Sequence, residues 1–130
     1  MIFIGDSVIL TCKSNDDFEY CTWKHEKDFC TYEWKYATKR VIRQSCTLNN
    51  IVYKGDHGND NIRECKILLN SVSRKDQGKW SCHIQEYCRF SCKGKKASKY
   101  IDLKFTEKES NAPSIGNKYL TILMKTGTLN

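Results

Sequence analysis

The sequence predicts a single all-β domain, a sandwich of short strands, from three observations. Apolar and polar residues alternate in several short runs, and the three-to-four-residue spacing of an amphipathic helix is absent. Turn-forming residues separate these runs. The chain of 130 residues contains eight cysteines, an even number that is typical of a small disulfide-stabilised extracellular domain. A chain of this length holds one domain with a modest core.

Seven or eight short strands are expected along the chain, because alternation with period two is the signature of a half-buried strand. The clearest runs cover residues 7–12, 20–25, 30–37, 51–54, 64–72, 79–84 and 100–105. The residues that share a face are Val8 with Leu10 and Cys12, Cys21 with Trp23, Tyr32 with Trp34 and Tyr36, Cys65 with Ile67 and Leu69, Trp80 with Cys82 and Ile84, and Ile101 with Leu103 and Phe105. Frequent turns between such strands favour a sandwich or a barrel.

The composition changes after Phe105. Residues 106–118 are polar and contain the single proline, as a linker would. We therefore expect the domain to cover residues 1–107. Residues 108–130 are expected to be a polar linker or tail that is flexible, forms a stray strand, or begins a truncated segment.

The N-terminal residues 1–10 lack the basic and small-residue features of a signal peptide, and no apolar run is long enough to span a membrane. We therefore expect the chain to be either the mature segment or a fragment of a longer secreted or cell-surface protein, and the fragment is favoured.

The cysteines favour disulfides over zinc. Zinc sites need ligands in close pairs, and Cys88 with Cys92 is the one pair that approaches this spacing. A link between the inner faces of two packed sheets is expected from Cys12 on an early strand to Cys82 on a late one. Trp23 would fill the space beside this bridge.

The stretch "DQGKWSC", residues 76–82, resembles the D-x-G-x-Y-x-C stretch that leads into strand F of immunoglobulin domains. Gly78 permits a tight turn into the strand, and Trp80 stands where the family usually has tyrosine. The Cys12, Trp23, Cys82 spacing and the I-x-L-x-x-V pattern of Ile67, Leu69 and Val72 also match. The resemblance, over residues 5–105, implies an immunoglobulin-like β-sandwich.

Cys21, Cys65 and "WSC" are closer to extracellular immunoglobulin-like domains of the cysteine-rich, arthropod type. That resemblance implies a Cys21–Cys65 bridge. Cys30 with Cys46 is the next expected pair, and Cys88 with Cys92 would staple the tip of the hairpin between strands F and G. The sequence does not fix these three pairings, and other connectivities stay open.

The resemblance implies an extracellular recognition or adhesion module that binds a protein partner. Loops and exposed aromatic residues are the usual contacts of such modules. The expected binding residues lie in the F–G hairpin and on one face of the run at residues 30–37: Arg89, Phe90, Lys93, Lys95, Lys96, Lys99, Tyr32, Trp34 and Tyr36. The alternative for the hairpin is a restrained, solvated loop, and the alternative for the aromatic face is that neighbouring loops cover it.

The formal net charge is +7, and bases dominate residues 89–104. The alternative function is therefore a secreted domain that binds heparan sulfate or another polyanion through the basic hairpin. Nucleic acid is not expected as a partner, because disulfides argue against a nuclear location. No metal or cofactor motif and no assembled catalytic motif stands out, so we expect neither a cofactor nor an enzyme.

Overall fold

The computed structural model describes residues 1–35, 37–38, 40–54, 63–88, 94–107 and 117–124. These residues form eleven strands and one short 3-10 helix. The elements are β1 (Ile2–Phe3), β2 (Ser7–Ser14), β3 (Phe18–His25), β4 (Asp28–Lys35), β5 (Arg40–Cys46), β6 (Ile51–Tyr53), β7 (Glu64–Leu69), η1 (Arg74–Asp76), β8 (Gly78–Glu86), β9 (Lys96–Leu103), β10 (Phe105–Thr106) and β11 (Asn117–Met124).

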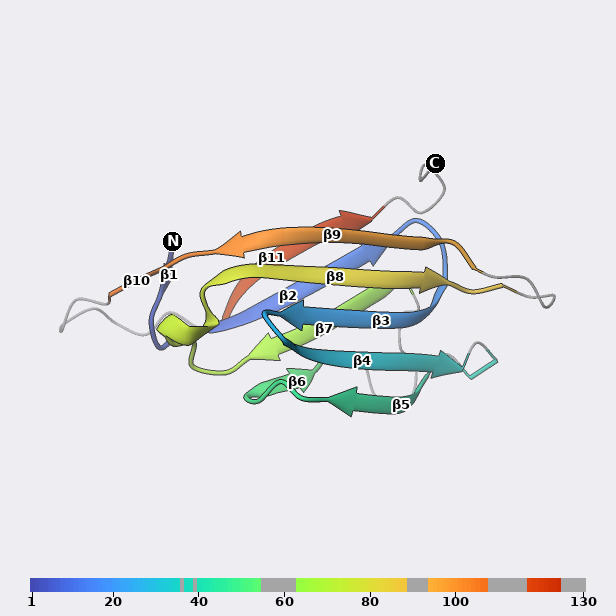
Figure 1. The fold of residues 1–130 in the computed structure, drawn as a ribbon, viewed down its shortest axis with the longest axis horizontal. Coiled ribbons are helices and arrows are strands. Elements are labelled where there is room, and N and C mark those ends of the chain that lie inside the picture. The colour runs from blue at the N-terminus through green and yellow to red at the C-terminus, as the bar shows by residue number, and fades with distance from the viewer. Residues whose placement is uncertain (36, 39, 55–62, 89–93, 108–116, 125–130) are drawn as a thin grey trace.

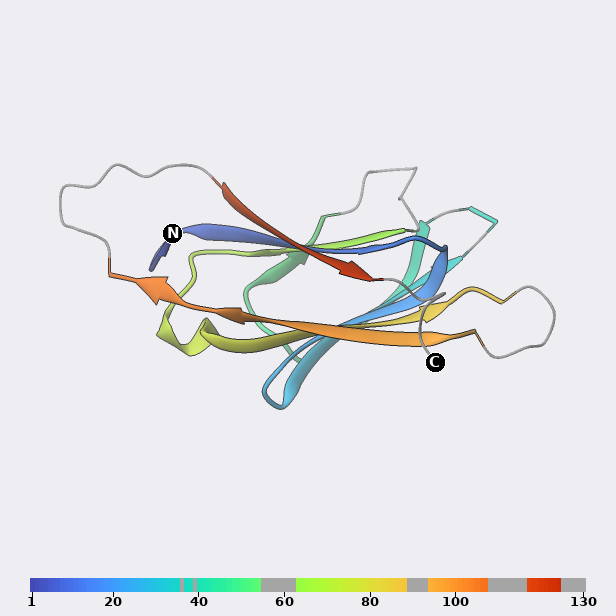
Figure 2. The same ribbon diagram turned by 90° about the horizontal axis from the view of Figure 1, so that it is seen from above.

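Two sheets pack face to face, which confirms the expected immunoglobulin-like β-sandwich. One sheet has the strand order β5-β4-β3-β8-β9 and the other β11-β2-β7-β6, while β1 and β10 form a short parallel pair. Figure 1 looks onto the five-stranded sheet, with the four-stranded sheet behind it, and Figure 2 shows the two layers from the side. The sandwich therefore has one broad outer face on each sheet.

Alternation along the strands builds the core between the sheets. Val8, Leu10 and Cys12 point inward from β2, and Trp80, Cys82 and Ile84 point inward from β8, all with side chains almost completely buried. Trp23 is fully buried beside them. Val72, just after β7, completes the I-x-L-x-x-V pattern and is buried as well.

Two disulfides connect the sheets, as expected. Cys12 on β2 is bonded to Cys82 on β8, and Cys21 on β3 is bonded to Cys65 on β7. Cys12 lies directly opposite Cys65 in the β2–β7 pair, so the two bridges run side by side, with the Cys21 and Cys82 sulfurs 3.9 Å apart. The sheets are thus tied together at one place in the core.

A further disulfide lies within the five-stranded sheet. Cys30 on β4 is bonded to its register partner Cys46 on β5, which confirms the third expected pair. Cys88 is also disulfide-bonded. Its expected partner, Cys92, lies outside the described residues.

The turn into β8 keeps its expected backbone. Gly78 has φ +104°, a left-handed conformation that residues with a side chain rarely adopt. Asp76 ends η1, and its carboxylate accepts hydrogen bonds from the backbone N–H and the hydroxyl of Ser73. The indole Nε1 of Trp80 donates to the Asp76 carbonyl oxygen at 2.8 Å. The side chain two residues before the cysteine thus bonds back to the corner formed by residues 76–78, although tryptophan stands there in place of tyrosine.

The expectation that Tyr32 and Trp34 form an exposed face is wrong. Both side chains are almost fully buried and pack with Tyr53 of β6, at ring-centroid distances of 4.9 Å and 5.8 Å. Burial also raises the pKa of Tyr32 to about 12. The physical reason is register: Tyr32 lies opposite Cys21, whose side chain points into the core. Tyr36 lies outside the described residues.

Of the alternatives expected for the segment after residue 107, its described residues form a strand. Residues 117–124 form β11, which pairs in parallel with the whole length of β2. Ile122 joins the core with 7% of its surface exposed, and Leu120 packs against the core. The sandwich therefore extends beyond the expected boundary at residue 107.

Candidate functional site

The outer face of the five-stranded sheet carries a regular grid of polar side chains. Pairing of β3, β8 and β9 aligns them in three rows, which are Tyr20–Gln85–Lys96, Thr22–His83–Ser98 and Lys24–Ser81–Tyr100. These side chains point outward because their neighbours in each strand, such as Trp23, Cys82 and Ala97, point into the core. The covalent core thus fixes the backbone beneath the grid.

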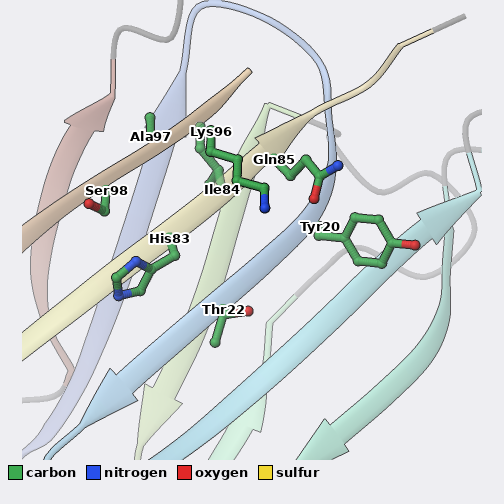
Figure 3. Close-up of a pocket in the computed structure, with 8 residues that line it drawn as sticks. All are labelled: Tyr20, Thr22, His83, Ile84, Gln85, Lys96, Ala97 and Ser98. Carbon is green, nitrogen blue, oxygen red and sulfur yellow. The ribbon is translucent and has the colours of Figure 1, made fainter. Parts of the chain in front are cut away.

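A hollow of about 370 Å³ lies over the first two rows of the grid (Figure 3). Its lining side chains are Tyr20, Thr22, His83, Gln85, Lys96 and Ser98. Ile84 and Ala97 also contribute atoms, although their side chains are buried on the inner face. In Figure 3 the amine of Lys96 points toward the space between His83 and Gln85.

Hydrogen bonds hold part of this lining in place. The Tyr20 hydroxyl donates to Glu33 Oε2 at 3.4 Å, and the hydroxyls of Thr22 and Thr31 are 2.9 Å apart. His83 Nε2 lies 3.0 Å from the Ser81 hydroxyl, which orients the imidazole ring. Hydrogen bonds to β4 therefore hold Tyr20 and Thr22 in place at this side of the hollow.

The electrostatics differ between the two sides of the hollow. Partial burial, and then the nearby ammonium of Lys24, lower the pKa of His83 below 6.5, so its ring is neutral at physiological pH. Burial, followed by the carboxylates of Glu33 and Glu19, raises the pKa of Tyr20. Two carboxylates thus act on Tyr20, where Arg43 offsets part of their effect, and the Lys24 ammonium acts on His83.

A second hollow, of about 330 Å³, lies next to the first where β3 and β8 meet the turns at their ends. Lys24, Lys79 and Ser81 line it, together with the corner residues Gln77 and Gly78. Lys79 lies over the ring of Tyr100, with Nζ 4.3 Å from the ring centroid. The polar grid therefore continues toward an exposed aromatic residue.

The structure separates the residues expected to bind a partner. Lys96 lies in the hollow. Lys99 lies opposite Cys82 in the β8–β9 register, an odd number of positions from Lys96, so it belongs to the other face of β9. Lys95 lies just before β9 and is exposed. Arg89, Phe90 and Lys93 lie outside the described residues, as does most of the expected hairpin tip. The described lysines of the hairpin therefore do not share one face.

Sequence reasoning missed Tyr20, Thr22, His83, Gln85 and Ser98 as lining residues. Alternation along the strands could have indicated that they face outward. Each lies an odd number of positions from an inward residue of its own strand, such as Cys21 or Cys82. What the sequence did not supply is the register between β3, β8 and β9, which brings these side chains together.

Comparisons with known proteins add no assignment: no family model and no curated protein matches the chain. Among the described residues there is no cluster of three or more side chains suited to hold a metal ion. None of the helices in the described part is long and apolar enough to cross a membrane.

Proposed function

We propose that this chain is an extracellular recognition module that binds a protein partner through the outer face of the five-stranded sheet. The observation that carries the proposal is this broad outer face, which none of the other described elements covers (Figures 1 and 2). The three disulfides support an extracellular location, since such bridges persist outside the reducing cytosol.

The composition of this face suits a contact surface. Tyr100 is 61% exposed and has Lys79 stacked on its ring. Arg43 of β5 is also exposed and lies 3.7 Å from Glu33. Tyrosine and arginine are enriched at protein interfaces, where they supply contact area and directed hydrogen bonds. The rigid sheet beneath them limits the entropy lost on binding.

The test compares two matched tyrosines on opposite faces of the sandwich. Tyr100 lies on the five-stranded sheet and Tyr119 on the four-stranded sheet, and they are 61% and 69% exposed. The oxidised chain is screened against a panel of extracellular domains that includes the chain itself. Each partner found is then titrated with the wild type, Tyr100→Ala and Tyr119→Ala.

Loss of Tyr100 should weaken partner binding by about tenfold or more, as expected when an aromatic side chain buried by the partner is truncated. Tyr119→Ala should leave the affinity unchanged. The reverse pattern would move the contact to the four-stranded sheet. Retention on heparin alone, with no protein partner in the panel, would favour the polyanion-binding alternative.

A further inference from the structure

Three polar side chains in the main hollow have no hydrogen-bond or ion-pair partner among the described residues. The side chains of Gln85, Lys96 and Ser98 make no hydrogen bond or ion pair with any described residue. They come from neighbouring strands and border one space of about 370 Å³. A ligand in this space would meet an amide, an ammonium and a hydroxyl that are all available for hydrogen bonding.

Two lysines lie at or beside the hollow: Lys96 lines the main hollow, and Lys24 lines the second hollow next to it. Lys24 and Lys96 form no ion pair with any carboxylate in the described part of the chain, whereas Lys13 and Lys66 both pair with Glu64. His83, between them in the grid, is neutral and can donate through one ring nitrogen and accept through the other. The acids near the hollow, Glu33 and Glu19, act on Tyr20 at the opposite side.

The dimensions narrow the class of ligand. The hollow crosses three strands, so Lys96 and Tyr20 are separated by two inter-strand spacings, about 10 Å. A lone phosphate, sulfate or carboxylate would fill little of this width. A six-membered ring that carries hydroxyls and one carboxylate spans it, with the charge at β9 and the ring near Tyr20.

We propose that the hollow binds one acidic sugar unit, whose carboxylate contacts Lys96 and whose hydroxyls contact Ser98, Gln85 and His83. The aromatic face of Tyr20 supplies an apolar platform for the C–H face of the ring. The inference goes beyond the proposed function and does not depend on it, because a small ligand tests it without any protein partner.

The experiment titrates the oxidised, full 130-residue chain with glucuronic acid and with N-acetylneuraminic acid and follows backbone amide shifts by NMR. Glucose, which shares the ring but lacks the carboxylate, is the ligand control. Lys96→Gln is the test variant. Lys54→Gln is its matched control, because Lys54 is an exposed lysine just after β6 on the other sheet.

At least one of the two sugar acids should shift amides of β8 and β9 in a saturable way, and glucose should bind about tenfold more weakly because it lacks the charged contact. Lys96→Gln should reduce the affinity by a similar factor, and Lys54→Gln should not. The proposal is overturned if neither acid shifts these amides at millimolar concentration, if glucose binds equally well, or if both lysine variants weaken binding alike.

A second arm identifies the source of the sugar. Hyaluronan oligosaccharides present glucuronate inside a chain, whereas sialyllactose presents an acidic sugar at a terminus. Shifts with the first indicate that the hollow accepts a chain interior, and shifts with the second alone indicate a terminal residue. A loss of partner binding in Tyr100→Ala with sugar binding intact would separate the two proposals.

Discussion

The side chain of Trp80 makes a hydrogen bond back to the corner that precedes its strand. Its indole N–H reaches the Asp76 carbonyl at 2.8 Å, and its ring stacks on His25 with centroids 4.5 Å apart. His25 Nε2 in turn lies 2.8 Å from the Gln77 carbonyl oxygen. Two successive backbone groups of the corner thereby have side-chain partners, although neither partner is a hydroxyl.

The corner predicts a difference between two buried tryptophans. Trp80→Phe removes the bond to Asp76, whereas the Nε1 atom of Trp34 is buried with no partner among the described residues. Both changes remove similar ring volume, so Trp80→Phe should lower the free energy of unfolding by about 1 kcal/mol more than Trp34→Phe. Urea unfolding of the two oxidised variants measures this. An equal or larger loss for Trp34→Phe would argue against the corner bond.

His83 predicts a pH dependence of stability. Its folded-state pKa lies below 6.5, because of burial and the Lys24 ammonium, so the folded chain binds this proton less readily than the unfolded chain. Stability should therefore be unaffected by His83 above pH 6.5 and should fall as the pH drops below that value. NMR titration of the ring should give a pKa below 6.5.

Lys24→Gln tests the charge contribution to this shift. It should move the pKa of His83 upward, toward its usual value, and added salt should do the same because the pair is only partly buried. Lys54→Gln is the control and should leave the pKa unchanged. A ring that titrates above 6.5 in the wild type would contradict the argument.

At the scale of elements, β11 is the strand whose role is least visible in the sequence. It joins an early strand more than a hundred residues away and completes one edge of the four-stranded sheet. Its inward residues, Leu120 and Ile122, add to the core, whereas Tyr119 and Thr121 face solvent.

Ile122→Ala should therefore destabilise the fold by about 2 kcal/mol or more, the range for truncating a buried aliphatic side chain. Thr121→Ala, its exposed neighbour on the same strand, should change stability by less than about 0.5 kcal/mol. Urea unfolding compares both with a chain that ends at residue 107, which should lose at least as much stability as Ile122→Ala. Equal stability of all of these chains would show that β11 contributes nothing to the fold.

Local pattern explains which elements the sequence could predict. Alternation identified the inward faces of β2, β7 and β8, because it is a property of one strand. The resemblance to immunoglobulin-like domains implied the Cys12–Cys82 and Cys21–Cys65 bridges, whereas Cys30–Cys46 was one of several open pairings. The buried positions of Tyr32 and Trp34 required the β3–β4 register, which brings Tyr32 opposite Cys21. The hollow likewise depends on the register of three strands, and periodicity within one strand carries no such information.

For the whole molecule, a disulfide that closes a longer stretch of chain should contribute more to the free energy of unfolding. Cys12–Cys82 joins the two sheets across a sequence separation of 70 residues, whereas Cys30–Cys46 joins adjacent strands across 16. In the chain-entropy model these closures contribute about 4 and about 3 kcal/mol. Cys12 and Cys82 are both fully buried, but Cys46 is exposed, so loss of the first bridge also removes more packing.

The double variant Cys12→Ala with Cys82→Ala should therefore lose at least about 1 kcal/mol more than Cys30→Ala with Cys46→Ala. Urea unfolding measures the difference, and mass spectrometry of unreduced peptides confirms that the remaining bridges keep their partners. If the β4–β5 bridge proved the costlier to remove, the stability of the sandwich would rest on that edge of the five-stranded sheet. The two bridges in the core would then serve mainly to fix the spacing between sheets that hydrophobic packing already holds together.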